Sequence, residues 1–174
     1  MSSATTNAAT ESEKKEQGAL EITCPCGKCK IRAINEPLGC GVCHCNECRV
    51  ITQGVAFEGV AFPKQSFETL EGNLVSLPRP DGIKMTEHRC GECLSMLYHT
   101  EIHELDILGT SEIRRCGRTK KHPEDDDRFL KPAFHCWYSE RLYDVDDELP
   151  KFSDSAEAFG GTGKMLNNDG TPKE

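Results

Sequence analysis

Cysteines at short, repeated spacings are the residues of this chain that could do chemistry. The chain has 11 cysteines in 174 residues, and eight of them form the CxxC pairs Cys26/Cys29, Cys40/Cys43, Cys45/Cys48 and Cys90/Cys93. Repeated CxxC pairs predict bound zinc, because two thiolates at this spacing can reach one metal ion. Four thiolates close a structural site, whereas three leave a position open for water or a substrate.

The spacing is compatible with more than one partition of these cysteines. The four CxxC pairs could build two closed zinc ribbons, and the protein would then be a binding module. Alternatively, Cys24 and Cys26 join the pair Cys90/Cys93 in a closed site. That partition leaves an open site, which is the group Cys43, Cys45 and Cys48. Cys40 lies three residues before Cys43 and could reach the second zinc and close it, so the spacing alone decides neither reading.

The order of these motifs resembles the glutathione-dependent formaldehyde-activating enzyme (GFA) family, which includes centromere protein V. A CxCG motif begins at Cys24, a CHCxxCR motif begins at Cys43, and a CxxC motif begins at Cys90. Further matching positions are Gly54, Phe57, Leu105–Thr110, Lys131–Trp137 and Leu149–Phe152. The resemblance covers roughly residues 18 to 155, and the CHCxxCR block between the other two motifs is its most specific part.

The resemblance implies a mainly β, Mss4-like (β-tent) fold with two zinc ions per chain. By position, the ligands of the structural zinc are Cys24, Cys26, Cys90 and Cys93, and those of the catalytic zinc are Cys43, Cys45 and Cys48. The family's named activity joins glutathione and formaldehyde into S-(hydroxymethyl)glutathione. We therefore expect a carbon–sulfur lyase that acts on glutathione, or a similar small thiol, and an aldehyde or thiol adduct.

The chain departs from the family pattern at several positions. Cys29 stands where an aliphatic residue is usual, His88-Arg89 replaces Arg-Phe, and Leu94 replaces a glycine. The additional cysteines are Cys40, Cys116 and Cys136. We expect these cysteines and Cys29 to be small buried residues rather than ligands, with Cys40 as the exception to watch.

The chemistry expected of the open site follows from its sulfur ligands. A zinc ion with three thiolates suits a fourth sulfur, and a thiol that binds there loses its proton. Such a thiolate can attack an aldehyde carbon, and in reverse it is a good leaving group. His44, Glu47 and His135 are candidates to move the proton, although packing or ligand-orienting roles are the alternative for both histidines. Arg49 is the candidate for binding a substrate carboxylate, or else a surface arginine.

Composition and charge indicate one domain. We expect a disordered N-terminal tail over residues 1–17, a GFA-like zinc domain over 18–159 and a flexible C-terminal tail over 160–174. The formal charge of −8 opposes binding to a nucleic-acid backbone. No apolar stretch is long enough to span a membrane, and the N-terminus has no apolar signal core. An odd number of cysteines without a signal favours a reducing, cytoplasmic compartment.

Short strands must position the cysteines. We expect strands over 21–23, 30–34, 53–62, 67–71, 84–89, 96–100, 105–109 and 133–138, and a short helix over 46–49. The residues Arg114, Arg115, Arg118, Lys120 and Lys121 form a basic segment that acidic residues 124–127 follow directly. We read it as a solvated loop with self-compensating charge, with a glutathione-carboxylate or nucleic-acid contact as the alternative.

Three functions stay open on the sequence. The first is the carbon–sulfur lyase, and the second is a lyase or dehydratase that acts on a larger metabolite or its thiol conjugate through the same open zinc. The third is a non-enzymatic zinc module that binds protein or nucleic acid. An open zinc beside a concave pocket favours an enzyme, whereas a closed zinc beside a flat basic face favours the binding module.

Overall fold

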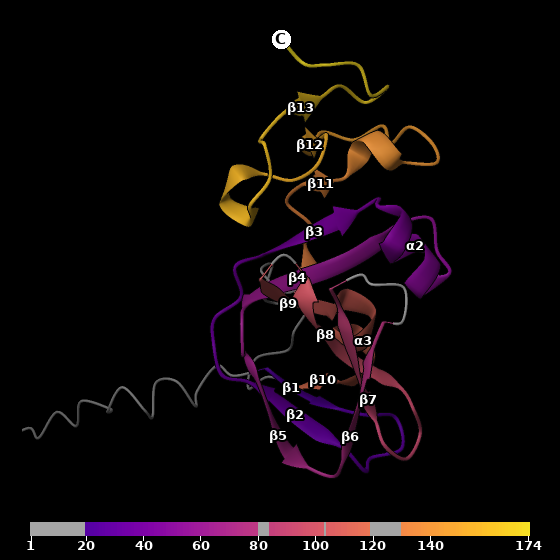
Figure 1. Cartoon of the computed structure of the whole chain (residues 1–174), viewed down its shortest axis with the longest axis vertical. Helices are drawn as coiled ribbons and strands as arrows, with labels where there is room; N and C mark the ends of the chain where they lie inside the picture. The colour runs from indigo at the N-terminus through magenta and orange to yellow at the C-terminus, as the bar shows by residue number, and fades with distance from the viewer. Residues whose placement is uncertain (1–19, 80–83, 103, 119–129) are drawn as a thin grey trace, which may run out of the picture.

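Short β-strands are the main secondary structure of the described residues, as expected from the sequence (Figure 1). The structure is a computed structural model, and it describes residues 20–79, 84–102, 104–118 and 130–174. The predictions for residues 1–17, Lys120, Lys121 and the acidic segment 124–127 concern residues outside these ranges. Strands dominate the described residues, so the mainly β prediction is confirmed, while the Mss4-like assignment stays a prediction.

Two sheets contain the strands. The smaller sheet has the order β10 (Gly117–Arg118), β1 (Glu21–Thr23), β2 (Lys30–Ala33) and β5 (Phe67–Glu71). The larger sheet has the order β13 (Met165–Leu166), β12 (Lys151–Phe152), β11 (His135–Cys136), β3 (Gly39–Cys43), β4 (Phe57–Pro63), β9 (Leu105–Gly109), β8 (Met96–Ile102), β7 (Thr86–Cys90) and β6 (Leu74–Pro78). The helical segments are α2 (Asn46–Thr52), α3 (Thr110–Cys116), η2 (Tyr138–Glu140) and η3 (Glu157–Phe159).

Side-chain alternation explains how the smaller sheet covers the core. In β2, Ile31 and Ala33 are buried, and Lys30 and Arg32 point to the other face. Both basic residues contact Glu21 of β1, at 2.6 and 2.9 Å. The hydrogen bonds from these two side chains lower the pKa of Glu21.

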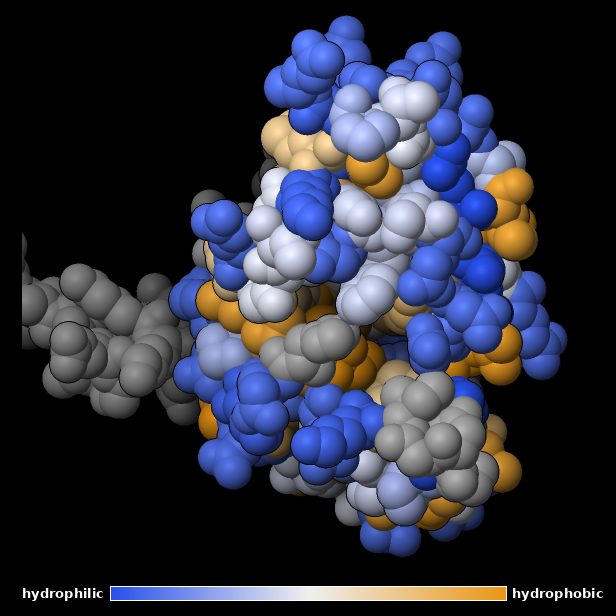
Figure 2. All heavy atoms as spheres, turned by 45° about the horizontal axis from the view of Figure 1, so that its top comes forward, coloured by the Kyte–Doolittle hydropathy of each residue, from blue (hydrophilic) through white to orange (hydrophobic). Residues whose placement is uncertain are grey.

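The buried apolar side chains of both sheets and of α3 meet in one core. Its fully buried members include Leu20, Ile22, Ile31, Val60, Phe62, Leu97, Leu108 and Ile113. Cys24, Cys29, Cys40 and Cys90 belong to the same core. Outside it, Figure 2 shows a face on which hydrophilic residues predominate, in keeping with a chain that is 29% charged.

The C-terminal segment extends the larger sheet at one edge with three short strands (Figure 1, orange and yellow). Strand β11 runs parallel to both β3 and β12, and β13 pairs antiparallel with β12. The hydroxyl of Tyr138, which is fully buried, donates to the carbonyl oxygen of Asn168 at 2.7 Å. The domain boundary at residue 159 stays a prediction. Residues 165–168, which lie in the predicted C-terminal tail, contact Tyr138 and β12.

Two strand predictions need correction. Residues 53–56, the start of the strand predicted over 53–62, form a turn, and β4 begins at Phe57. The pattern over residues 133–138 predicts a strand, but only His135–Cys136 pairs with its neighbours. Trp137 takes a left-handed backbone conformation, with φ of 53°, and the chain then enters the turn η2. An extended strand cannot continue through that conformation, so Trp137 ends it directly after Cys136.

Candidate metal centres

The first cluster joins the β1–β2 knuckle to the turn after β7. The sulfur atoms of Cys24, Cys26, Cys90 and Cys93 all lie within 4.8 Å of one another. Cys24 and Cys90 are buried, and Cys26 and Cys93 are exposed. Because the two pairs are more than 60 residues apart in the chain, a metal ion at this point would tie together both sheets.

Backbone amides shape this cluster for thiolates. The amide of Cys29 donates to the sulfur of Cys24 at 3.1 Å, and the amide of Leu94 donates to the carbonyl oxygen of Cys90 at 2.9 Å. A hydrogen bond from Ser95 lowers the pKa of Cys93 to about 6. The donors to the sulfur atoms of Cys24 and Cys93 stabilise a sulfur anion, so the cluster is suited to a cation that is bound by thiolates.

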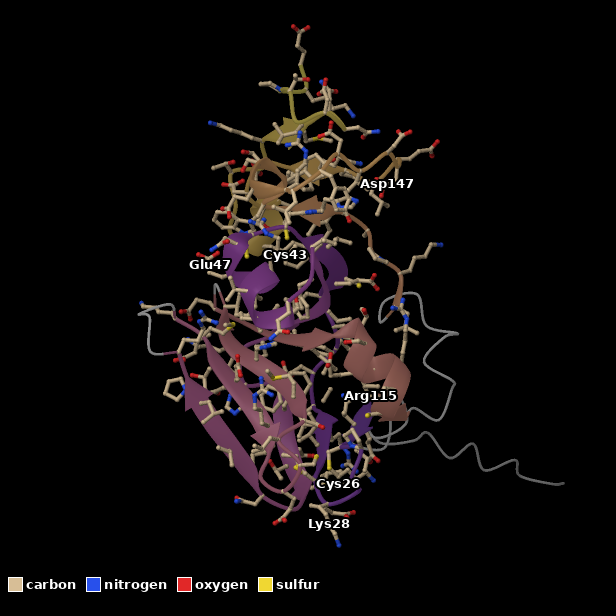
Figure 3. The ribbon with its side chains drawn as sticks, turned by 90° about the vertical axis from the view of Figure 1, so that its right-hand side faces the viewer. Cys26, Lys28, Cys43, Glu47, Arg115 and Asp147 are labelled. Carbon is tan, nitrogen blue, oxygen red and sulfur yellow. The ribbon has the colours of Figure 1, made fainter. Side chains whose placement is uncertain are left out.

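The second cluster lies where β3 passes into α2. The sulfur atoms of Cys43, Cys45 and Cys48 also lie within 4.8 Å of one another. Cys45 is the N-cap of α2, and its sulfur accepts the amide of Cys48 at 3.3 Å. An N-cap acceptor satisfies one of the free amides of the first turn, so the helix start itself positions two of the three sulfurs. Figure 3 shows Cys43 and Cys26 in different parts of the molecule.

Cys136 provides a fourth sulfur beside the second cluster, although the sequence predicts a small buried residue there rather than a ligand. Strand β11 pairs with β3 so that Cys136 lies directly opposite Cys43. Hydrogen bonds from the thiols of Cys136, then Cys45 and Cys48, lower the pKa of Cys43. The only sequence signal was that Cys136 stands in a predicted strand, because no local pattern reveals a parallel pairing across more than 90 residues.

Cys40, the residue expected to be able to close this site, faces the opposite way. In β3, Gly39, Gly41 and Cys43 line a cavity, and Cys40 between them is buried in the core. An odd separation along a strand places Cys40 and Cys43 on opposite faces. Burial raises the pKa of Cys40 to about 12, which is the behaviour of a core thiol.

A chain of buried hydrogen bonds leads away from the second cluster. The ring nitrogen Nε2 of His44 lies 2.8 Å from Nδ1 of His135, whose Nε2 lies 2.9 Å from Oδ2 of Asp147. Asp147 in turn accepts from the ammonium of Lys151, which is almost completely buried. Burial, then the nearby charge of His135, lowers the pKa of His44 to about 4. The ring of His44 is thus directed to His135, which fixes the loop between Cys43 and Cys45.

Arg49 and Glu47 lie on α2 with different surroundings. The guanidinium of Arg49 donates to the backbone carbonyl oxygens of His44 and Glu140, so it connects the cysteine loop to η2. Its proposed contact with a substrate carboxylate stays a prediction. Glu47 lines an open cleft together with Cys45 and Cys48.

The second cluster lies between two hollows of different character. A cavity of about 100 Å³ has an almost wholly apolar lining, which includes Phe57, Ile107, Phe134 and Phe159. A cleft of about 420 Å³ has a mixed lining, in which apolar side chains such as Ile51 and Met85 stand beside charged ones; the charged ones are Lys84, Glu47, Glu101, Glu104 and Glu140. Cys43, Cys48, Ile102 and Trp137 line both hollows. A metal ion at the cluster would therefore be reachable from either side.

Comparisons with known proteins identify a family for this chain. The model of the GFA family, glutathione-dependent formaldehyde-activating enzyme, matches residues 19–140. None of the curated proteins matches the chain. A crystal structure of a Rhodobacter sphaeroides protein is similar to 60% of this chain and 93% of that one, with 18% identity and a TM-score of 0.43. Across the described ranges, every helix is too short or too polar to cross a membrane.

Proposed function

This chain is a member of the glutathione-dependent formaldehyde-activating enzyme family, and from that premise we propose that it is a zinc-dependent carbon–sulfur lyase. The substrates would be glutathione or a similar thiol and its aldehyde adduct. The observation that carries the proposal is the three-cysteine cluster that two hollows expose. A site of this kind has room for a substrate, which a purely structural metal site does not need.

The donor sets of both clusters fit zinc. Sulfur atoms that lie within 4.8 Å of one another match the spacing that a tetrahedral ion with Zn–S distances of about 2.3 Å requires. We propose Cys24, Cys26, Cys90 and Cys93 as ligands of a structural zinc. Cys43, Cys45 and Cys48 would hold the catalytic one. A zinc ion bound there would supply Lewis acidity that favours the thiolate form of a bound thiol.

The residues around the second cluster would position its ligand loop and exchange a proton with the substrate. The bonded pair His44–His135 holds the ligand loop in place, with Asp147 fixing the ring of His135. Glu47, which lines the cleft, is placed to exchange a proton with a substrate oxygen there. Trp137 lines both hollows beside the cluster, so it would contact a substrate bound in either one.

The apolar cavity favours a second candidate of the same class. Glutathione carries two carboxylates, and both the apolar lining and the glutamates of the cleft disfavour them. A lyase or dehydratase acting on a larger, apolar metabolite or its thiol conjugate would use the same cluster. The hollows beside the cluster disfavour a non-enzymatic zinc module. We also propose that the protein acts in a reducing compartment such as the cytoplasm.

A direct test compares thiols of different character. We expect the full-length zinc protein to accelerate the exchange between a thiol and formaldehyde, as measured by NMR, for glutathione or for an aryl thiol. Cys45→Ser should lose this acceleration. Cys116→Ala, in α3 and in neither cluster, should retain it. If the wild type accelerates exchange with neither thiol, the lyase proposal is wrong.

A further inference from the structure

Cys136 is held beside the second cluster by the contacts of its own backbone. The amide of His44 donates to the carbonyl oxygen of Cys136 at 3.0 Å, and Cys136 pairs with Cys43 across β3 and β11. On one side of it, the ring of His135 is bonded to His44 and Asp147. On the other side, Trp137 turns the chain away. The position of Cys136 relative to the cysteine loop is therefore fixed by the fold and not by a mobile segment.

The side chain of Cys136 points the same way as that of Cys43. Neighbouring parallel strands lie about 4.8 Å apart, and residues directly opposite each other project from the same face. Both residues, together with Cys48, line the apolar cavity. Cys43 and Cys136 are therefore neighbours across the two strands, and both face the cavity. A fourth sulfur donor thus lies beside the three cysteines that would hold a metal ion here.

Cys136 is nevertheless not a member of the second cluster. Among the described residues, the sulfurs at this place that all lie within 4.8 Å of one another are those of Cys43, Cys45 and Cys48. The first cluster differs, because there four sulfurs fulfil that criterion together. Cys136 therefore lies beside the second cluster and not within it.

We propose that Cys136 is a displaceable fourth ligand of the metal held by Cys43, Cys45 and Cys48. In the substrate-free protein its thiolate fills the coordination position, and an incoming thiol replaces it. The bond between the metal and the Cys136 sulfur breaks as the bond to the substrate sulfur forms. The proton that the substrate thiol gives up passes to Cys136, so the exchange is balanced in charge and needs no further reactant.

This inference rests on metal binding at the second cluster, which the proposed function also requires. It adds a reason for the apolar cavity. A thiol released from the metal is neutral and is well accommodated among Phe134 and Trp137, whereas a charged group would not be. It also gives the site selectivity, because only a ligand that binds the metal more strongly than Cys136 can enter.

Cadmium-113 NMR of the full-length protein loaded with two cadmium ions tests the proposal, because the shift reports the number of sulfur ligands at each site. The wild type should show two resonances, both in the four-sulfur range. In Cys136→Ala and in Cys136→Ser, one resonance should move upfield to the three-sulfur range and the other should stay in place. The unmoved resonance comes from the first cluster and shows that each variant is folded. Cys40→Ala should move neither resonance.

Two results would overturn the inference, and they differ in what else they affect. If one wild-type resonance already lies in the three-sulfur range and Cys136→Ala leaves it unchanged, Cys136 is not a ligand, although the open site and the lyase proposal remain. If the wild type shows a single resonance from the first cluster, the second cluster binds no metal, and both proposals are wrong.

Discussion

Removal of the Asp147 carboxylate should destabilise the protein, because this group compensates the charge of a buried lysine. The Lys151 side chain is only 1% exposed, and its ammonium donates to Oδ1 of Asp147 at 2.5 Å. It also donates to the carbonyl oxygens of Asp147 and Leu149, at 3.0 and 3.1 Å. Burial opposes the charge of Asp147, but the hydrogen bonds from Lys151 and His135 outweigh it and lower the pKa of Asp147 to about 2.

The magnitude follows from the unequal burial of the two partners. Breaking a buried ion pair by removing one partner costs about 3–5 kcal/mol. The Asp147 side chain is 36% exposed, so water screens part of the interaction. Lys151 also keeps its two carbonyl acceptors. We therefore expect Asp147→Ala to lower the free energy of unfolding by about 2–3 kcal/mol.

Urea unfolding of the zinc-loaded protein measures this effect. Asp144→Ala is the matched control, because Asp144 pairs with Arg141 at the surface and is 59% exposed, and it should cost under about 1 kcal/mol. The double variant Asp147→Ala/Lys151→Met should recover most of the loss, since an apolar side chain then replaces the uncompensated ammonium. A loss from Asp147→Ala no larger than that of the control would refute this account of Lys151.

Three further outcomes are expected. Burial lowers the pKa of His99 to about 4. The unfolded chain therefore binds more protons than the folded one between about pH 6.5 and 4. The free energy of unfolding should fall by up to about 3 kcal/mol as the pH drops through that range. His99→Leu should flatten the slope of unfolding free energy against pH, and an unchanged slope would contradict it. Leu94 has a φ of 56° and is 56% exposed. Leu94→Gly should raise the free energy of unfolding in urea by about 0.5–1 kcal/mol, because relief of the left-handed strain exceeds the entropy cost of glycine. A lower free energy of unfolding would refute the strain argument. Cys90→Ser should lose one zinc and cooperative unfolding together, and a variant that keeps two zincs and an unchanged melting curve would disprove the structural assignment.

Much of the second cluster could be predicted from the sequence because it is local. Cys43, Cys45 and Cys48 lie within six residues, and a strand that passes into a capped helix brings their sulfurs together. The first cluster joins segments that are far apart, and the spacing left open whether Cys40 belongs to the second, so the assignment of ligands to both clusters depended on the resemblance to a family. The structure gathers both groups as sets of sulfur atoms, while their metal content stays a prediction.

The surroundings of the cluster could not be predicted, because they depend on long-range register. The parallel pairing of β11 with β3 brings Cys136 opposite Cys43. The same pairing brings His135 to His44. A pattern of apolar residues does not specify which strand will be the neighbour, nor that Trp137 ends the strand with a left-handed residue. The apolar cavity is likewise a product of tertiary packing and has no local signal.

The most direct test of the account is whether a thiol-type ligand binds the metal at the second cluster. Zinc K-edge X-ray absorption of the full-length protein with the selenol form of glutathione, and with an aryl selenol, would detect a zinc–selenium distance. The account predicts selenium in the zinc shell of the wild type with at least one of the two ligands. It predicts none in Cys45→Ser, which should retain the zinc of the first cluster. A wild-type protein with two zinc ions and no selenium neighbour would contradict the central claim that this cluster activates a thiol.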